Sequence, residues 1–484
     1  MKRSTRDVDS SRHSLIDKIA PRLAAQSTTQ IAVRLVKKIT EKLQSEVSFA
    51  RPSRSETSAR KQPATPEKSL PGVLKPELKS KKGSSDLAAR IAAKLIAYPP
   101  GVVRRSATPG GPDVKVVDPR LADCSLSIMV ARTDLAFMMH TIPHLVKMCR
   151  FPFRERVLFV DTAPLSGDKL KRPDIGSMEQ LREACQTLLD RGVVDRVTDI
   201  DYNPNLRKAL YQKHFGLPLN PTHNWKGYPI YGSLYSLEAI EGEYILHFDS
   251  DMMMYQAVDH DWISAAISLI EKRSEVVAVR PLGGPPTQNE NQLAKIAYRY
   301  DPDGFYGFKF FSSRAYLLSR QRFEQLLPMP VLWKGTRHDW YNALPNGLRT
   351  YINHATGTDR LDSWELMVSR QFELGRWLRA SLASPQAWTL HPNFRSPEFF
   401  AALPFILANI EAGRFPAEQA GEYDLILEPW LAMIDPEEWA EALNRLPASQ
   451  RGQTWNMKAS QPRSAAIPVG LNIDTPRRER TGIL

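Results

Sequence analysis

The segment AIEGEYILHFDSDMMM, residues 239–254, carries the strongest structural signal in this 484-residue chain. Its apolar run has the length of a buried strand and ends in two aspartates, Asp249 and Asp251, with one serine between them. Because side chains alternate along an extended chain, we expect both carboxylates to point the same way. Carboxylates that enter an apolar environment need a compensating cation, and oxygen ligands suit Mg²⁺ or Mn²⁺. The segment therefore predicts a divalent metal site at the end of a buried strand.

Four other Asp-x-Asp pairs show that the spacing alone is weak evidence, so sequence context has to separate the five pairs. The others are Asp7/Asp9, Asp199/Asp201, Asp259/Asp261 and Asp301/Asp303. Asp7/Asp9 lies in a polar tail, Asp199/Asp201 in a loop, and Asp301/Asp303 around a proline in a turn. Asp259/Asp261 lies at a helix start, where carboxylates cap the backbone. The pair that ends a buried strand is Asp249/Asp251. The alternative for this pair is a hydrogen-bonded structural turn.

Strand-like and helical patterns alternate on both sides of this segment. Residues 125–131, 156–161 and 276–281 have the pattern of buried strands, and residues 178–192, 261–275 and 361–380 that of helices. This alternation predicts an α/β fold with a largely parallel sheet. Ligands bind such sheets beyond the carboxyl ends of the strands. Arg132, Thr133 and Asp161, which follow two of the strands, are therefore candidate ligand contacts.

Three segments together resemble a known family. SLSIMVART has the form of a first strand with a nucleotide-contacting end, RVLFVDTA that of a second strand, and residues 262–281 that of the helix and strand after the metal motif. With the Asp249–Asp251 segment, residues 124–392 resemble a GT-A fold glycosyltransferase, family 2-like. The resemblance implies a Rossmann-like, mostly parallel sheet flanked by helices. It also implies that Arg132, Thr133, Asp161 and Asp249 meet the nucleotide-sugar.

The same resemblance extends to the metal and to the acceptor side. It implies that Asp249 and Asp251 hold Mn²⁺ or Mg²⁺ on the diphosphate. WTLHP, residues 388–392, resembles the stretch that in some relatives supplies a histidine to the metal, so His391 is a candidate third ligand. A structural histidine is the alternative for His391.

DSWELMVSRQFELG, residues 362–375, resembles the helix that carries the acceptor-side acid. The family usually has an adjacent Glu-Asp pair, whereas here two residues separate Asp362 from Glu365. Either acid would take the proton from the acceptor hydroxyl. The alternative is a capping box, with Asp362 as the N-cap and Glu365 reaching back to it. Trp364 between them has two interpretations, a core residue or a sugar platform.

The segment before the metal motif departs from the family pattern. Many family 2 enzymes carry an Arg-Asn pair there, and this chain has Ser233 and Leu234. The segment is rich in tyrosine instead. Tyr228, Tyr231 and Tyr235 are expected either to pack in the core, the commoner role of aromatic residues at helical spacing, or to line a sugar or base pocket.

The positive charge is confined to the first quarter of the chain. Residues 1–120 carry 25 Lys and Arg against 11 Asp and Glu, whereas residues 121–484 carry 40 against 42. We therefore expect no specific nucleic-acid partner for the main body. The composition predicts a disordered basic tail over residues 1–118, with short amphipathic helices at 31–43 and 86–96, a GT-A domain over 119–397, a helical extension over 398–454 and a disordered tail over 455–484.

Three cysteines at long spacings fit neither a disulfide framework nor a zinc site, which favours a reducing compartment. The sequence has no apolar run of membrane-spanning length and no secretory signal pattern at its start. We therefore expect a cytoplasmic protein, with peripheral contact to an anionic membrane through the basic tail as a further hypothesis.

The leading hypothesis is a metal-dependent glycosyltransferase that moves a sugar from a UDP- or GDP-linked donor to an acceptor hydroxyl on a glycan or a lipid-linked substrate. A sugar nucleotidyltransferase is the second hypothesis, although MVARTDLAF lacks the glycine-rich phosphate loop that such an enzyme would carry. A non-catalytic, basic-tailed adaptor that binds anionic lipid or RNA is the third.

Overall fold

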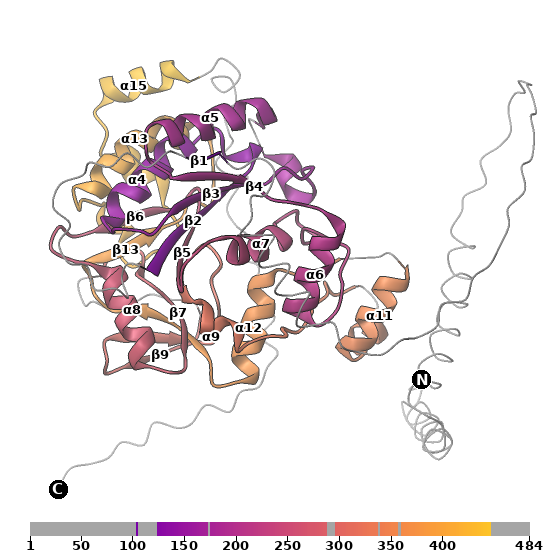
Figure 1. Ribbon diagram of the computed structural model, residues 1–484. Helices are drawn as coiled ribbons and strands as arrows, with labels where there is room; N and C mark the ends of the chain where they lie inside the picture. Colours follow the sequence, from indigo (N-terminus) through magenta and orange to yellow (C-terminus); the bar gives the residue numbers. More distant parts are fainter. Residues whose placement is uncertain are drawn as a thin grey trace, which may run out of the picture. The chain divides into compact units, whose positions relative to one another are not determined.

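The computed structural model describes residues 103–104, 123–172, 175–287, 296–336, 339–356 and 360–446 (Figure 1). The tail expected over residues 1–118, apart from residues 103–104, and the tail over 455–484 lie outside these ranges, as do the amphipathic helices expected at 31–43 and 86–96. The described residues fall into two compact units: residues 347–356, which belong to one helix, and all the others. The larger unit contains every candidate site residue.

The first half of the main sheet is parallel. The strand order in this half of the sheet is β4-β3-β2-β5. It places β2 (Cys124–Val130) between β3 (Arg156–Val160) and β5 (Tyr244–Asp249), with β4 (Arg196–Asp199) outside β3. These strands pair in parallel, and β1 (Val103–Arg104) adds an antiparallel edge beside β4. The carboxyl ends of β2, β3 and β5 therefore meet at one edge.

The second half of the sheet is mixed. β11 (Ala315–Ser319) lies antiparallel between β5 and β7 (Val276–Arg280), and β12 (Leu378–Leu382) lies parallel to β7. β10 (Phe305–Phe308) and β9 (Tyr298–Asp301) complete this edge as an antiparallel hairpin. The α/β prediction is thus confirmed, and the parallel character is concentrated in the four strands that lead to the predicted site.

The helices follow the sequence pattern with local differences. They are α4 (Met138–Cys149), α5 (Met178–Asp190), α6 (Pro204–Phe215), α7 (Tyr231–Ala239), α8 (Trp262–Lys272), α9 (Arg320–Glu324), α10 (Asp339–Asn342), α11 (Asn346–Thr356), α12 (Trp364–Leu374), α13 (Pro397–Glu411), α14 (Leu427–Leu431) and α15 (Pro436–Arg445), with short 3₁₀ turns η2 (Arg132–Asp134), η3 (Gly167–Lys171) and η4 (Ala417–Gln419). α4 continues through Pro143. The helix predicted over residues 361–380 is wrong at its end, because residues 378–382 pair with β7 and β10 as β12.

Alternate side chains of the sheet are covered by different helices. Leu126, Leu158 and Leu246 share one apolar cluster with residues of α4, α5 and α8. Val157 and Ile245, one residue out of step, share another with residues of α6, α7, α9 and α12. This follows from the two-residue side-chain period of strands that are buried on both faces. The central strands are therefore held from both sides, which fixes the position of their carboxyl ends.

A small second sheet lies next to the predicted metal segment. β6 (Met253–Gln256), which begins two residues after Asp251, pairs with β13 (Ala387–Leu390), and β13 pairs with β8 (Leu282–Gly283). Apolar residues of α13 and α14 cover this sheet in a third cluster. β13 leads directly into His391, so the small sheet brings the segment after residue 390 to the end of β5. In the described ranges, no helix is long and apolar enough to cross a membrane.

Glu238 on α7 joins α7 to α6 through a largely buried carboxylate. Its carboxylate lies 2.9 Å from His214 Nε2 and accepts a 2.9 Å hydrogen bond from Lys213 Nζ, both on α6. Burial alone would raise the pKa of Glu238, but hydrogen bonds and charge from His214 and Lys213 bring it down to about 2. The ionised form therefore stabilises the folded state at neutral pH.

Replacing Glu238 by Gln should lower the free energy of unfolding by about 2 kcal/mol at pH 7, because a charge-assisted hydrogen bond is lost. A carboxyl with a depressed folded-state pKa stabilises the protein above its unfolded-state pKa and loses that contribution as pH falls towards about 2. Urea unfolding measured in steps below pH 4.5 should therefore show that the difference in free energy of unfolding between wild type and variant becomes smaller. Glu324→Gln, which meets Lys213 at an exposed site, is the matched control. A difference in free energy of unfolding that does not change with pH would contradict this account.

Candidate active site

The Asp249–Asp251 turn begins where β5 ends. The backbone N–H of Asp249 donates to the Arg314 carbonyl at 2.7 Å, and that of Met252 donates to the Asp249 carbonyl at 3.1 Å. The extended chain stops at Asp249, so the expectation that both carboxylates follow one strand alternation is wrong from Ser250 onwards. As a result the two aspartates differ in exposure: the side chain of Asp249 is 45% exposed, and that of Asp251 is 6% exposed.

Ser250 locks this turn against the end of the neighbouring strand β2. Its hydroxyl donates to Asp134 Oδ2 at 2.9 Å, and the same Asp134 oxygen accepts the backbone N–H of Ala131, also at 2.9 Å. The hydroxyl of Thr141 on α4 donates to the Ser250 carbonyl. The turn is thus fixed from both β2 and α4, which holds the two aspartates in place.

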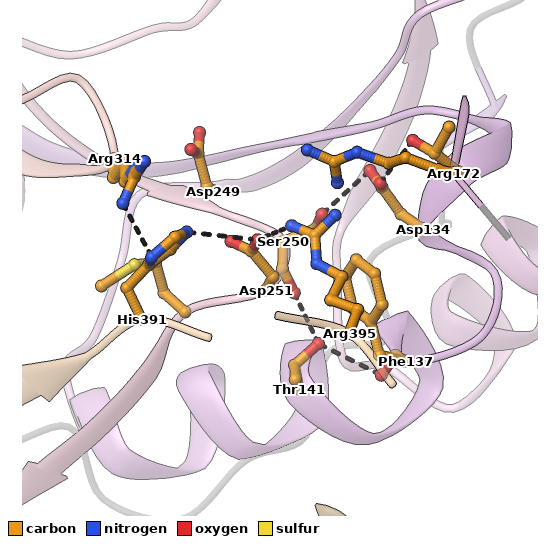
Figure 2. A network of polar contacts seen from close by, with 12 residues as sticks. Asp134, Phe137, Thr141, Arg172, Asp249, Ser250, Asp251, Arg314, His391 and Arg395 are labelled. Atoms are coloured by element: carbon orange, nitrogen blue, oxygen red, sulfur yellow. Dashed lines mark hydrogen bonds and ion pairs between the residues drawn. The ribbon is translucent and has the colours of Figure 1, made fainter. Parts of the chain in front are cut away.

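Asp251 is a buried carboxylate that meets two cationic or protonatable groups (Figure 2). Arg395 Nη2 forms an ion pair with Oδ2, and His391 Nε2 lies 3.7 Å from the same oxygen. The Arg395 guanidinium also lies 4.8 Å from the centre of the Phe137 ring. Oδ1 has no hydrogen-bond partner within the described part of the chain. One oxygen of this buried carboxylate therefore has no hydrogen-bond partner among the described residues.

His391 links Asp251 to Arg314, which directly precedes β11. Arg314 Nη1 donates to His391 Nδ1 at 2.7 Å, and Asp424 Oδ1 lies 3.4 Å from the same nitrogen. Burial, together with the charge of Arg314, lowers the pKa of His391, although Asp424 acts in the opposite direction. A neutral imidazole results, and the choice between Arg314 and Asp424 at Nδ1 sets which nitrogen carries the proton.

A cleft of about 540 Å³ lies over these residues. Its lining is Thr133, Asp168, Lys171, Arg172, Tyr228, Asp249, Asp251, Arg314, His391, Pro392, Asn393, Phe394, Arg395, Pro397 and Phe400. Four of the residues predicted from the sequence are thus brought together: Thr133, Asp249, Asp251 and His391. Arg132 and Asp161 are not part of this lining.

Asp161 is buried, and its carboxylate is already engaged. Tyr202 donates to Oδ1 at 2.7 Å, and His223 Nε2 lies 3.1 Å from Oδ2. Lys169 Nζ lies 3.8 Å from Oδ2. Burial by itself would raise the pKa of Asp161, but His223, Lys169 and Tyr202 lower it to about 2. In this structure Asp161 ties β3 to η3 and to the segments that carry Tyr202 and His223, and it is not among the residues that line the cleft.

Glu365 and Asp362 are separated by the structure. Ser363 caps α12 by accepting the N–H of Leu366, so the capping box expected between Asp362 and Glu365 is wrong. Asp362 Oδ1 accepts the N–H of Ser363. Glu365 Oε1 instead accepts the N–H of Ser313 at 3.1 Å, and burial raises the pKa of Glu365 above its ordinary value. Glu365 lines a second cavity of about 360 Å³, and Asp362 does not.

The two cavities share part of their lining. Arg314 and Asn393 line both the cleft over Asp251 and the cavity over Glu365. A group bound in one is therefore next to a group bound in the other. This arrangement separates the acids into a pair at Asp249 and Asp251 and a third at Glu365, with Arg314 between them.

The sequence interpretation missed the arginines. Arg172, Arg314 and Arg395 line the cleft, yet none of them belongs to a recognised motif. Arg395 follows His391 by four residues, and the chain turn after β13 brings both to Asp251. The aromatic residues divide as the two interpretations allowed: Tyr231, Tyr235 and Trp364 are buried in the core, whereas Tyr228 lines the cleft.

The side chains around Asp251 offer the oxygen and nitrogen donor types that bind divalent cations. Oδ1 of Asp251 lacks a partner, Asp249 is open to the cleft, and His391 Nε2 faces Asp251. Protonation of Nδ1 towards Asp424 would leave Nε2 free to bind metal. Across the described ranges, no group of three or more His, Cys, Asp and Glu side chains is already gathered at metal-binding distances. The Arg395 guanidinium instead supplies the positive charge that Asp251 needs.

Replacing Arg395 by Gln should lower the free energy of unfolding by about 3 kcal/mol without divalent cation, because Asp251 is left as an unpaired buried charge. Mn²⁺ should then raise the melting temperature of this variant more than that of the wild type, since the guanidinium no longer competes for the carboxylate. Thermal unfolding with and without Mn²⁺ measures this. Arg154→Gln, at an exposed ion pair, is the matched control. If Mn²⁺ raised the melting temperature of both proteins equally, Mn²⁺ and the Arg395 guanidinium would not compete for the Asp251 carboxylate, and this prediction would be contradicted.

Comparisons with known proteins give only distant similarity. No protein-family model matches the chain, and no curated protein matches it. Among solved structures, GalNAc-T7 with UDP, GalNAc and Mn²⁺ is 12% identical over 57% of this chain and 44% of that chain, with a TM-score of 0.33. The mannosyltransferase PcManGT from Pyrobaculum calidifontis, in complex with GDP-Man and Mn²⁺, is 11% identical over 51% and 55%, with a TM-score of 0.25.

A third solved structure is glucosyl-3-phosphoglycerate synthase from Mycobacterium tuberculosis with Mg²⁺ and uridine-diphosphate, 12% identical over 61% of this chain and 80% of that chain, with a TM-score of 0.25. The match spans about half the length of the first two proteins. At these identities and TM-scores the likeness carries no argument about substrate or mechanism. Both have to be argued from this chain's own side chains.

Proposed function

We propose that this protein is a metal-dependent glycosyltransferase of the GT-A type, which moves a sugar from a nucleotide-sugar to an acceptor hydroxyl. The observation that carries the proposal is the buried Asp251 carboxylate, whose Oδ1 has no hydrogen-bond partner among the described residues and which lines a cleft at the carboxyl end of the central parallel strands. Ligands of open α/β sheets bind at this end of the strands. A second acid, Asp249, lines the same cleft.

The cleft has the charges that a nucleoside diphosphate requires. Lys171, Arg172, Arg314 and Arg395 line it, and guanidinium groups form paired hydrogen bonds with phosphate oxygens. The exposed ring of Tyr228 offers an aromatic face for a base or sugar. These groups would bind and orient the donor, which we expect to be UDP- or GDP-linked.

Asp249, Asp251 and His391 would hold the cation in this proposal. When bound, Mn²⁺ or Mg²⁺ neutralises the charge that develops on the departing diphosphate. Binding of the cation to Asp251 would release Arg395, which already lines the cleft and would then face the phosphates. For His391 Nε2 to bind the cation, Nδ1 would carry the proton and donate it to Asp424, in place of the hydrogen bond that Nδ1 accepts from Arg314.

Glu365 is the acid that we assign to the acceptor. It lines the cavity that adjoins the donor cleft, and its pKa is raised by burial, as suits a general base near neutral pH. Glu365 would take the proton from the acceptor hydroxyl as that oxygen attacks the sugar. Direct displacement with inversion at the anomeric carbon is the expected course. Asp362, which lines neither cavity, has no such access.

Asp251→Asn should reduce sugar transfer or donor hydrolysis at least about 100-fold, because the variant loses the carboxylate charge that the cation needs. A panel of nucleotide-sugars with Mn²⁺ or Mg²⁺, scored for nucleoside diphosphate release, measures this. The matched control is Asp259→Asn, an exposed aspartate of another Asp-x-Asp pair. Release of pyrophosphate from a sugar phosphate and a nucleoside triphosphate would favour a nucleotidyltransferase instead.

Glu365→Gln should abolish the acidic limb of the pH profile. A general base works when deprotonated, so kcat/KM of the wild type should rise with pH through a pKa above the ordinary glutamate value. The variant should lose transfer by about 100-fold and lose this limb, while its affinity for the nucleoside diphosphate is unchanged. Asp362→Asn should keep both rate and limb. An unchanged profile in Glu365→Gln would remove Glu365 from the mechanism.

A further inference from the structure

The cavity over Glu365 is unusual in its concentration of arginine. Arg280 comes from the end of β7, Arg379 from β12, and Arg314 from the turn before β11, and all three line this cavity of about 360 Å³. Three carboxylates, Glu365, Glu422 and Asp424, also belong to its lining. The arrangement of these charges, rather than their sum, decides what the cavity can bind.

Arg379 and Arg280 are buried without a carboxylate partner in the described part of the chain. Arg379 is 2% exposed; its Nε donates to the Phe310 carbonyl at 2.9 Å, and Nη1 has no hydrogen-bond partner. Arg280 is 6% exposed, and its Nε also lacks a partner. The two guanidinium groups lie over aromatic rings, Arg379 at 4.2 Å from Phe308 and Arg280 at 4.8 Å from Tyr423.

The two buried arginines also repel each other. Burial lowers the pKa of both groups, and the charge of Arg280 lowers that of Arg379 further. Arginine does not lose its proton in proteins, so the cost remains as an unfavourable free energy of the folded state. A buried charge without a partner is strongly destabilising, and such strain is characteristic of binding sites.

The carboxylates of the lining do not relieve this cost. Asp424 lies 3.4 Å from His391 Nδ1, on the side of the donor cleft, where it influences Arg314. Glu365, the acid that influences both Arg280 and Arg379, accepts the N–H of Ser313, and its pKa is raised. Glu422 forms no ion pair with a residue that the structure describes. The end of the cavity at Arg280 and Arg379 therefore keeps a positive charge.

We propose that this cavity binds an anionic group of the acceptor, a phosphate or a carboxylate, between Arg280 and Arg379. Guanidinium groups recognise both anions through paired N–H donors, and the unpartnered Arg280 Nε and Arg379 Nη1 are such donors. An anion held there leaves the hydroxyl of the same molecule near Glu365 and the shared wall at Arg314. The role as acceptor rests on the proposed transferase function, whereas anion binding does not.

Thermal unfolding tests anion binding directly. Inorganic phosphate and glycerol 3-phosphate at about 10 mM should raise the melting temperature by about 2 °C or more, as expected for a ligand that binds the folded state. Glycerol, and sodium chloride at equal ionic strength, should not. A parallel titration with lactate reports whether a carboxylate serves as well as a phosphate. Absence of a shift with both anion classes overturns the proposal.

Variants locate the site. Arg379→Met and Arg280→Met should each abolish the anion shift, yet unfold at the same or a higher temperature than the wild type without ligand, because an unpaired buried charge has been removed. Arg379→Lys should keep part of the shift. Arg370→Met, at an exposed ion pair on α12, is the matched control and should behave as the wild type. If the Met variants melt lower and the Lys variant loses the shift, the arginines are structural. If the anions raise the melting temperature of the Met variants as much as that of the wild type, the anion binds elsewhere and the proposal is overturned.

The donor cleft needs a separate control, because it too is lined by arginines. The anion shift should persist in Asp251→Asn and in the presence of saturating UDP with Mn²⁺. Loss of the shift under UDP would place the anion in the donor cleft and overturn the proposal. Failure of the transferase function would instead show as absent nucleoside diphosphate release with an intact anion shift, so the two failures are distinguishable.

Discussion

The site depends on one electrostatic constraint, the burial of the Asp251 carboxylate at the end of β5. A buried anion without a cation is too costly to retain, so the fold has to bring positive charge to this point. Arg395 and His391 do so from a segment more than 130 residues further along the chain. The small sheet of β6, β13 and β8 makes this possible, because β13 pairs beside the strand that follows Asp251.

The same constraint relates the two cavities. Charge is balanced at Asp251 by Arg395, whereas in the adjoining cavity Arg280 and Arg379 lack a counter-ion among the described residues. Arg314 contacts His391 and lines both spaces, so it lies where a donor and an acceptor would meet. The transfer that we propose, between substrates in neighbouring sites, would account for both charge patterns.

Local sequence patterns predicted much of the framework correctly. The strands at 124–130, 156–160, 244–249 and 276–280 and the helices at 178–190 and 262–272 lie within a few residues of their predicted positions. Period-two and helical spacing are local properties, so they survive in the sequence. β12 was predicted as helix, because its pairing with β7 and β10 depends on strands that are distant in the chain.

The sequence by itself determined that Asp249 and Asp251 follow a buried strand and that Thr133, His391 and Glu365 are candidates for one site. Only the tertiary structure decided where the candidates lie: the Asp161 carboxylate is engaged by Tyr202, Asp362 lines neither cavity, and Arg280, Arg314, Arg379 and Arg395 line the cavities. The reason is physical. A carboxylate at a strand end is encoded by a short apolar run, whereas the arginines that line the cavities come from separate elements and have no local pattern.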